Sequence, residues 1–272
     1  MRTPSTHTLP DGRTIVFDHR RQGAPDSVPV AFLNGLSQTT VAWGLQAQRL
    51  RGVRDVLLHD AAGQGRSSPP PEGHRPPGHA RDLVHLLDAL GIAQVDAVGF
   101  SYGSRIALRL ALQAPERVRR LVLVGCVHRD TTVRRWIVRS WLDAVVAGGL
   151  EHAFRVVTPM VMGDAWLSRN AADEAKMLRA FCERNSAEGV TRLLSDTLLP
   201  GGALAAADLA AIRAPTLVIR GEEDLVVSDV VSRELAAAIP GAAHVTCPGV
   251  GHTVAIEAPD WFAETVGTFL GG

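Results

Sequence analysis

The feature that most restricts the possible folds of this chain is a serine held between two glycines, where an apolar run meets a helical pattern. The motif is Gly99-Phe100-Ser101-Tyr102-Gly103, and the apolar run before it begins at Val95. After it, apolar residues recur at helical spacing: Ile106, Ala107, Leu110, Ala111 and Ala114. A serine in a sharp strand-to-helix turn needs neighbours without a Cβ, so that strand and helix can approach closely. The stretch therefore predicts strand, turn and helix with Ser101 as a candidate nucleophile; an ordinary glycine-rich turn is the alternative.

Strand patterns alternate with helical patterns through the first and last parts of the chain. Asp11-Gly12 predicts a hairpin turn before a strand at residues 14–19. Further strands are expected at residues 28–33, 53–59, 121–124, 215–220 and 243–247. A helix that carries Val41, Leu45 and Leu50 is expected after Thr39 or Thr40. A second helix should end at Leu90, and two more are expected at residues 230–239 and from Pro259 onward. Such alternation predicts an α/β fold, with a mainly parallel sheet and helices on both faces.

The alternation stops between residues 126 and 205, where helical patterns occur without a convincing strand. We expect this segment to be a helical cap, inserted between two halves of one core domain at residues 1–125 and 206–272. Most of its aromatic residues should pack inside the cap. A cap over a nucleophile also shapes the substrate pocket, so Trp136, Trp141 and Met160 are candidate substrate contacts.

Charge and cysteine content exclude several classes of function. Lysine and arginine number 28 and so do aspartate and glutamate, so no net charge favours nucleic acid or an anionic membrane. No run of about 18 apolar residues predicts a membrane span. Cys126, Cys182 and Cys247 are widely spaced and form neither a disulfide framework nor a metal-binding pair, which fits a reducing, cytoplasmic compartment. No cofactor is implied, and the oligomeric state is not predicted.

A serine hydroxyl is a poor nucleophile unless a base accepts its proton and an acid orients the base. Catalytic groups on parallel sheets collect beyond the carboxyl ends of the strands. Asp224 lies in a turn just after the strand expected at residues 215–220, and it is the candidate acid. Glu222, Glu223 and Asp130 are the alternative acids. The non-catalytic alternative is that Asp224 is an ordinary residue of a solvated acidic turn.

His252 is the candidate base, because it follows the last expected strand in the glycine-rich segment Pro248-Gly249-Val250-Gly251. On this kind of sheet the order along the chain is serine, acid, histidine. The other histidines considered all precede the acid and break this order: His59, His74, His79 and His128.

Acyl transfer from a carbonyl also needs two hydrogen-bond donors for the oxyanion that forms. One donor should be the backbone N–H of Tyr102, directly after the nucleophile. The other should come from the loop Asn34-Gly35-Leu36, where the Leu36 N–H is expected to donate and the Asn34 side chain is a candidate substrate contact. An ordinary Asn-Gly turn is the alternative.

Together these motifs resemble the α/β-hydrolase superfamily over nearly the whole chain apart from the cap. The segment Asp60-x-x-Gly63-x-Gly65-x-Ser67 adds to the resemblance, which implies that it is a structural loop near the pocket. The resemblance also implies an eight-stranded sheet. Many members have His-Gly where this chain has Asn34-Gly35, a change that a backbone donor should survive.

The pattern Asn34-Gly35-x-x-x-Thr39-Thr40-x-x-Trp43 is similar to a loop in bacterial enzymes that move 3-hydroxyacyl chains from acyl carrier protein, such as the rhamnolipid-precursor synthase. This resemblance implies an acyl ester or thioester substrate, with acyl carrier protein or CoA as possible partners. The sequence thus predicts a serine hydrolase that works through an acyl-enzyme on Ser101. The alternatives are an acyltransferase and, in another class, a ligand receptor without turnover.

Overall fold

An eight-stranded sheet forms the centre of the computed structural model, which describes residues 4–199 and 203–271. Its strands are β1 (Ser5–Thr8), β2 (Thr14–Arg20), β3 (Val30–Leu33), β4 (Val56–His59), β5 (Val95–Phe100), β6 (Val118–Val124), β7 (Thr216–Gly221) and β8 (Ala243–Cys247). They lie in the order β1-β2-β4-β3-β5-β6-β7-β8. β1 and β2 pair antiparallel and β2 joins β4 antiparallel, whereas all the other pairs are parallel. The predicted mainly parallel sheet is confirmed.

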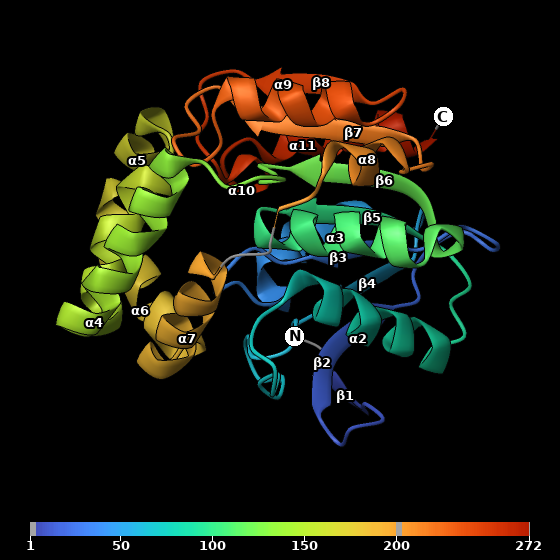
Figure 1. Cartoon of the computed structure of the whole chain (residues 1–272), viewed down its shortest axis with the longest axis horizontal. Helices are drawn as coiled ribbons and strands as arrows, with labels where there is room; N and C mark the ends of the chain where they lie inside the picture. Colours follow the sequence, from blue (N-terminus) through green and yellow to red (C-terminus); the bar gives the residue numbers. More distant parts are fainter. Residues whose placement is uncertain (1–3, 200–202, 272) are drawn as a thin grey trace.

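Helices cover both faces of this sheet (Figure 1). The elements on one face are α2 (Pro76–Ala89), α3 (Tyr102–Gln113), α8 (Ala206–Ala210) and α9 (Asp229–Ala238); those on the other are α1 (Gly44–Arg49), α10 (Val254–Glu257) and α11 (Pro259–Gly271). In β6, Leu121 and Leu123 pack with the first group, whereas Val122 and Val124 pack with the second. Successive side chains of a strand point to opposite faces, so a strand buried on both sides is apolar throughout.

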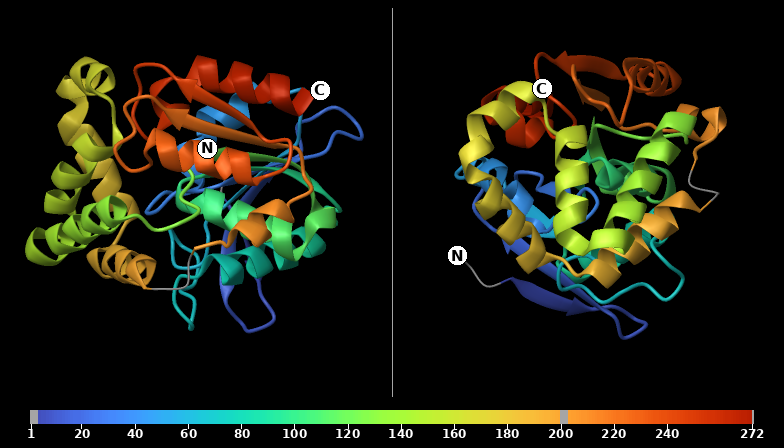
Figure 2. Two further views of the ribbon diagram at one scale, coloured as in Figure 1. Left: turned by 45° about the horizontal axis from the view of Figure 1, so that its top comes forward. Right: turned by 90° about the vertical axis from the view of Figure 1, so that its left-hand side faces the viewer.

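Between β6 and β7, the four α-helices before α8 cover one end of the sheet, as both views in Figure 2 show. They are α4 (Thr132–Val161), α5 (Asp164–Asn170), α6 (Glu174–Arg184) and α7 (Ala187–Leu198), with a short 3₁₀ turn, η3 (Ala171–Asp173). Gly148 and Gly149 have non-helical backbone angles and divide α4 into two parts. None of the helices in the described ranges is long and apolar enough to cross a membrane.

The helix expected after Thr39 begins differently from the prediction. A 3₁₀ turn, η1 (Thr40–Trp43), precedes α1, and the Thr39 side chain makes no capping hydrogen bond. Val41 and Leu45, whose spacing marked the helix, are 54% and 47% exposed, whereas Trp43 is buried and stacks on Phe32 at 4.7 Å between ring centroids. A 3₁₀ turn advances each residue further around the axis than an α-helix does, so the buried face shifts.

His59, His74 and His79, three of the histidines that could compete with His252, are buried. The ring of His79 is 5.8 Å from that of His74 and 5.7 Å from that of Tyr102. Neither ring nitrogen of His79 has a hydrogen-bond partner among the described residues. Burial lowers the pKa of His59 to about 4 and that of His79 to about 3, so both rings are neutral at physiological pH.

These buried rings predict a loss of stability in acid. Below pH about 6.5 the histidines of the unfolded chain bind protons, whereas the buried rings of the folded chain stay neutral. The free energy of unfolding therefore falls as the pH falls. For His79 alone the loss between pH 7.5 and pH 5 should be about 2 kcal/mol. We expect His79→Gln, followed by urea unfolding at both pH values, to lose that much less stability than the native chain.

The control is His85→Gln, because His85 is exposed on the same helix and should keep the native pH dependence. Burial raises the pKa of Asp60 to about 6, so protonation of Asp60 increases the stability of the folded chain as the pH falls. This effect is the same in the native chain and in both variants, and it cancels in the comparison. Equal acid sensitivity of His79→Gln and the native chain would contradict the interpretation.

Candidate active site

Ser101 occupies a strained turn between β5 and α3. Its backbone angles, φ 51° and ψ −111°, are unusual for a residue with a Cβ, and its N–H donates to the carbonyl of Val124 at 2.8 Å. A Cβ on Gly99 would lie 2.5 Å from the Gly103 carbonyl oxygen, and one on Gly103 would lie 2.2 Å from the Leu33 carbonyl oxygen. Both glycines are therefore required for the helix to start so close to the sheet.

Asp224 and His252 come together at the carboxyl edge of the sheet, beyond β7 and β8. Oδ2 of Asp224 is 2.7 Å from Nδ1 of His252, and both residues are buried. The other carboxylate oxygen, Oδ1, accepts hydrogen bonds from the N–H groups of Val226 (2.8 Å) and Val227 (2.9 Å). An acceptor at Nδ1 favours the tautomer with the proton on Nδ1, which leaves Nε2 free to accept a proton.

The other acidic candidates are occupied elsewhere. Glu222 accepts from the Gly249 N–H at 2.9 Å, and Glu223 accepts from the Asp164 N–H at 3.1 Å. Asp130 forms an ion pair with Arg134. Of the four acids considered, the structure brings only Asp224 to His252.

Gly125, which was not among the residues predicted from the sequence, creates the space that the His252 ring occupies. It follows β6 directly, with φ of 54°, and a Cβ there would lie 2.7 Å from Cε1 of His252. The ring of Phe100, the residue before Ser101, packs against the same imidazole at 4.9 Å between centroids. A glycine directly after a buried strand was the available signal, because that edge of a parallel sheet is where ligands bind.

The two proposed oxyanion donors are free to bind a ligand. Neither the Leu36 N–H nor the Tyr102 N–H donates a hydrogen bond within the described ranges. The loop is held in place by the side chain of Gln38, whose Oε1 accepts from the Gly35 N–H at 3.0 Å, and Ser37 adopts a positive φ of 55°. Leu36 and Tyr102 line the same cavity as Ser101.

This cavity lies between the sheet edge and the cap and is small, with a volume of about 20 Å³. Its apolar walls are Val127, Val138, Trp141 and Val226, which belong to the cluster that packs the cap onto the core. Two arginines, one from α3 and one from α4, also line it. The predicted contact Trp141 is therefore at the site.

The other predicted substrate contacts lie outside the cavity. Met160 lies behind Trp141, with its sulfur 3.1 Å from the indole nitrogen. Trp136 is 74% exposed on α4 and does not line the cavity. The Asn34 side chain is buried, donates to the His59 carbonyl at 2.9 Å and does not line the cavity, so it ties its loop to β4.

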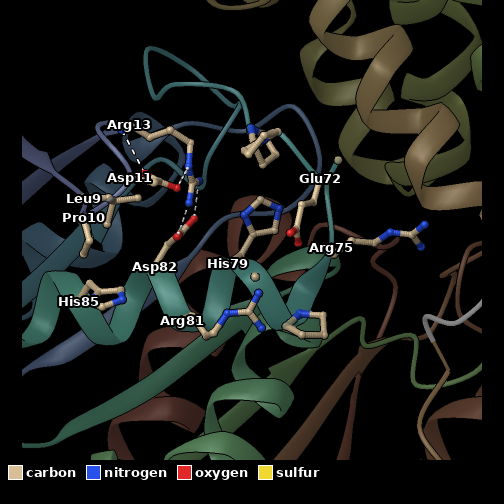
Figure 3. Close-up of a pocket in the computed structure, with 15 residues that line it drawn as sticks. Leu9, Pro10, Asp11, Arg13, Glu72, Arg75, His79, Arg81, Asp82 and His85 are labelled. Carbon is tan, nitrogen blue, oxygen red and sulfur yellow. Dashed lines mark hydrogen bonds and ion pairs between the residues drawn. The ribbon is translucent and has the colours of Figure 1, made fainter.

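A larger hollow, of about 460 Å³, is lined by other residues (Figure 3). Arg13 lines it, donates two hydrogen bonds of 2.8 Å to Asp82 and also pairs with Asp11. The three charged groups satisfy one another, and the hollow contains neither Ser101 nor its partners. Among the described residues no group of three or more histidine, cysteine, aspartate or glutamate side chains is arranged to hold a metal ion.

Glu257, which was not among the residues predicted from the sequence, joins the cap to the loop that carries His252. Its Oε2 accepts from the N–H groups of Gly163 (2.7 Å) and Gly251 (2.9 Å), and its Oε1 accepts from the N–H (3.0 Å) and hydroxyl (2.9 Å) of Thr253. In addition, the His252 N–H donates to the Val161 carbonyl at 2.9 Å. The end of α4 and the histidine loop are therefore fixed to each other through one buried carboxylate.

We expect Glu257→Gln to lower both stability and turnover. An amide keeps one acceptor oxygen but turns an NH₂ group toward donors, so buried N–H groups are left unsatisfied at a cost of about 2 kcal/mol. Thermal unfolding measures the stability, and kcat for an activated ester measures the looser histidine loop. Glu264→Gln is the control, because Glu264 is exposed on α11, and equal effects of the two changes would contradict the role of Glu257.

Comparison with known proteins agrees with the fold described above. The family model described as "alpha/beta hydrolase fold" matches residues 28–259. A protein of Azorhizobium caulinodans with the name "Putative carbamate hydrolase RutD" is 30% identical over 249 residues, covering 89% of this chain and 91% of that protein. A 2-hydroxymuconate semialdehyde hydrolase of Pseudomonas putida is 32% identical over 240 residues, or 84% and 80% of the two chains. MGS-M2, an alpha/beta hydrolase enzyme from a Medee basin deep-sea metagenome library, has a crystal structure that matches with a TM-score of 0.90 and 25% identity over 98% of both chains.

Proposed function

The chain belongs to the α/β-hydrolase family, and we propose that it is a serine hydrolase that cleaves an acyl ester or thioester through a covalent acyl-enzyme on Ser101. Hydrolysis is the reaction class of the relatives named above. The observation that carries the serine mechanism is the 2.7 Å contact of Asp224 with His252, whose ring packs against Phe100, the residue before the strained turn at Ser101.

In the proposed first step, the Ser101 hydroxyl attacks the substrate carbonyl and its proton passes to Nε2 of His252. Asp224 stabilises the imidazolium that forms, through its contact with Nδ1. The N–H groups of Leu36 and Tyr102 hold the negative charge that develops on the carbonyl oxygen. The imidazolium then protonates the leaving group, which departs and leaves the acyl group on the Ser101 oxygen.

In the second step, water gives a proton to Nε2 of His252 and attacks the acyl carbon. The acid product leaves, and the proton returns to the Ser101 oxygen. We favour water over an alcohol or thiol acceptor, because the residues behind the acyltransferase resemblance have structural roles. Trp43 packs in the core against Phe32, and the Thr40 N–H donates to Asp60 at 2.7 Å.

The proposal is tested by weighing the intact protein after exposure to a fluorophosphonate and to a panel of activated esters and thioesters. We expect a covalent adduct that peptide mapping places on Ser101, and free acid as the product of turnover. A new ester or thioester made with an added alcohol, CoA or acyl carrier protein would favour the transferase. Tight ligand binding without any adduct would favour a receptor, and turnover without an adduct would overturn the acyl-enzyme.

A further inference from the structure

Two buried arginines lie in the cavity that contains Ser101, and the proposed mechanism uses neither of them. Arg105 is on α3, four residues after the nucleophile, and Arg134 is in the first turn of α4 in the cap. They are 7% and 5% exposed. Arginine is rarely so buried unless its charge is paired, so both side chains need an explanation.

Arg105 has no partner in the part of the chain that the structure describes. Its guanidinium makes no hydrogen bond or ion pair there, and its Nε is completely buried without an acceptor. Asp196 lines a neighbouring hollow together with Arg105, but its Oδ2 accepts from the His74 N–H at 2.8 Å. A buried donor without an acceptor costs free energy, which a bound ligand can recover.

Arg134 is only partly neutralised. It pairs with Asp130, whose side chain lies at the edge of the buried region with 25% exposure. Burial, and then the nearby positive charge of Arg105, lower the pKa of Arg134 to about 10, so it remains charged at neutral pH. The group formed by Arg105, Arg134 and Asp130 thus carries two positive charges and one negative charge.

We propose that Arg105 and Arg134 form a subsite that binds a carboxylate carried by the ester substrate. This proposal rests on the proposed function, since it concerns the same cavity. A planar guanidinium matches the two oxygens of a carboxylate, and a single carboxylate would balance the one excess positive charge. Val138, Trp141 and Val226 form the apolar wall of the cavity, so the part of the substrate near the carboxylate should be a short hydrocarbon.

The first test compares esters that differ in one carboxylate. One pair places it on the acyl side, as mono-4-nitrophenyl glutarate against 4-nitrophenyl hexanoate. The other places it on the leaving group, as 4-acetoxybenzoate against 4-acetoxybenzamide. We expect the native chain to prefer the carboxylate in at least one pair by about tenfold or more in kcat/KM, the range of a charge-assisted hydrogen bond.

The variants are Arg105→Gln and Arg134→Gln. The readout is the ratio of kcat/KM for the ester with the carboxylate to kcat/KM for its neutral partner, because a general loss of activity lowers both values and leaves their ratio unchanged. We expect each change to lower the ratio by about tenfold. Arg105→Lys keeps the charge without the planar fork and should lower it less. Arg139→Gln is the matched control: Arg139 is exposed on α4 and pairs with Asp143, so the ratio should stay at the native value.

A second test needs no turnover. Calorimetry on Ser101→Ala should show binding of glutarate but not of glutaramide, and adding Arg105→Gln should abolish it. If the native chain hydrolyses no ester and Ser101→Ala still binds glutarate through Arg105, the hydrolase proposal fails and the subsite remains. If esters are hydrolysed with no preference for a carboxylate in either pair, or if the preference survives Arg105→Gln, the subsite is overturned.

Discussion

Ser101→Ala is expected to lower kcat for an activated acyl ester by about a million-fold, the scale seen when a triad nucleophile is removed. The reason is that no other hydroxyl can replace it. The neighbouring Ser104 is buried, and its hydroxyl contacts the carbonyl oxygens of Gly99 at 2.6 Å and Val124 at 3.0 Å. Steady-state hydrolysis of a 4-nitrophenyl ester, with mass spectrometry for the missing acyl adduct, measures the change.

The fold should survive this substitution, because the Ser101 hydroxyl makes no hydrogen bond to any residue in the described ranges, while the turn itself is strained. Ser101→Gly should in fact be more stable than the native chain by about 1 kcal/mol, since glycine accepts a positive φ without strain. Ser140→Ala on α4 is the control for loss of a half-buried hydroxyl. An active Ser101→Ala protein, free of native contamination, would remove the central claim.

The parts of the site that the sequence predicted are those that local pattern and chain order determine. The turn around Ser101 needs two glycines at fixed spacing, and the parallel sheet brings the ends of β7 and β8 to the same edge. Asp224 and His252 could be found for that reason, since both follow a strand directly. The strands were the easiest elements to predict, because strands buried on both faces are apolar throughout.

The cap residues could not be predicted in the same way. Trp136 and Trp141 lie five positions apart on α4, so they point about 140° apart around the helix axis, and only one of them can face the core. Apolar residues occur all round this helix, and its two glycines interrupt the period, so the sequence does not show which face is buried. Trp141 reaches the cavity, whereas Trp136 faces solvent.

Charged residues that act from buried positions were missed for a related reason. Arg105, Arg134 and Glu257 look like ordinary surface charges in the sequence, because most arginines and glutamates are exposed. Their burial depends on the cap closing over the sheet edge, which no local pattern reports. The residues that shape the cavity and fix the His252 loop therefore became visible only in three dimensions.

Asp224→Asn is expected to lower kcat/KM by about 10,000-fold while leaving the fold intact, as for the equivalent change in a serine protease triad. The surrounding donors decide how the new amide is oriented. Because Oδ1 accepts from the N–H groups of Val226 and Val227, the amide oxygen must stay there, and the NH₂ group then faces His252. That group donates to Nδ1 of His252, which places the ring proton on Nε2, so the imidazole can no longer take the proton of Ser101.

A second variant and a direct measurement of the His252 tautomer separate this effect from simple loss of a charge. Glu222→Gln removes an acid two residues away, whose carboxylate accepts from the Gly249 N–H and from no other described residue, and it should change kcat/KM by less than about tenfold. Nitrogen-15 NMR of the imidazole reports the protonated nitrogen directly: Nδ1–H in the native chain and Nε2–H in Asp224→Asn. A variant that keeps Nδ1 protonated, or keeps native kcat/KM with the proton on Nε2, would show that Asp224 does not act through the His252 tautomer.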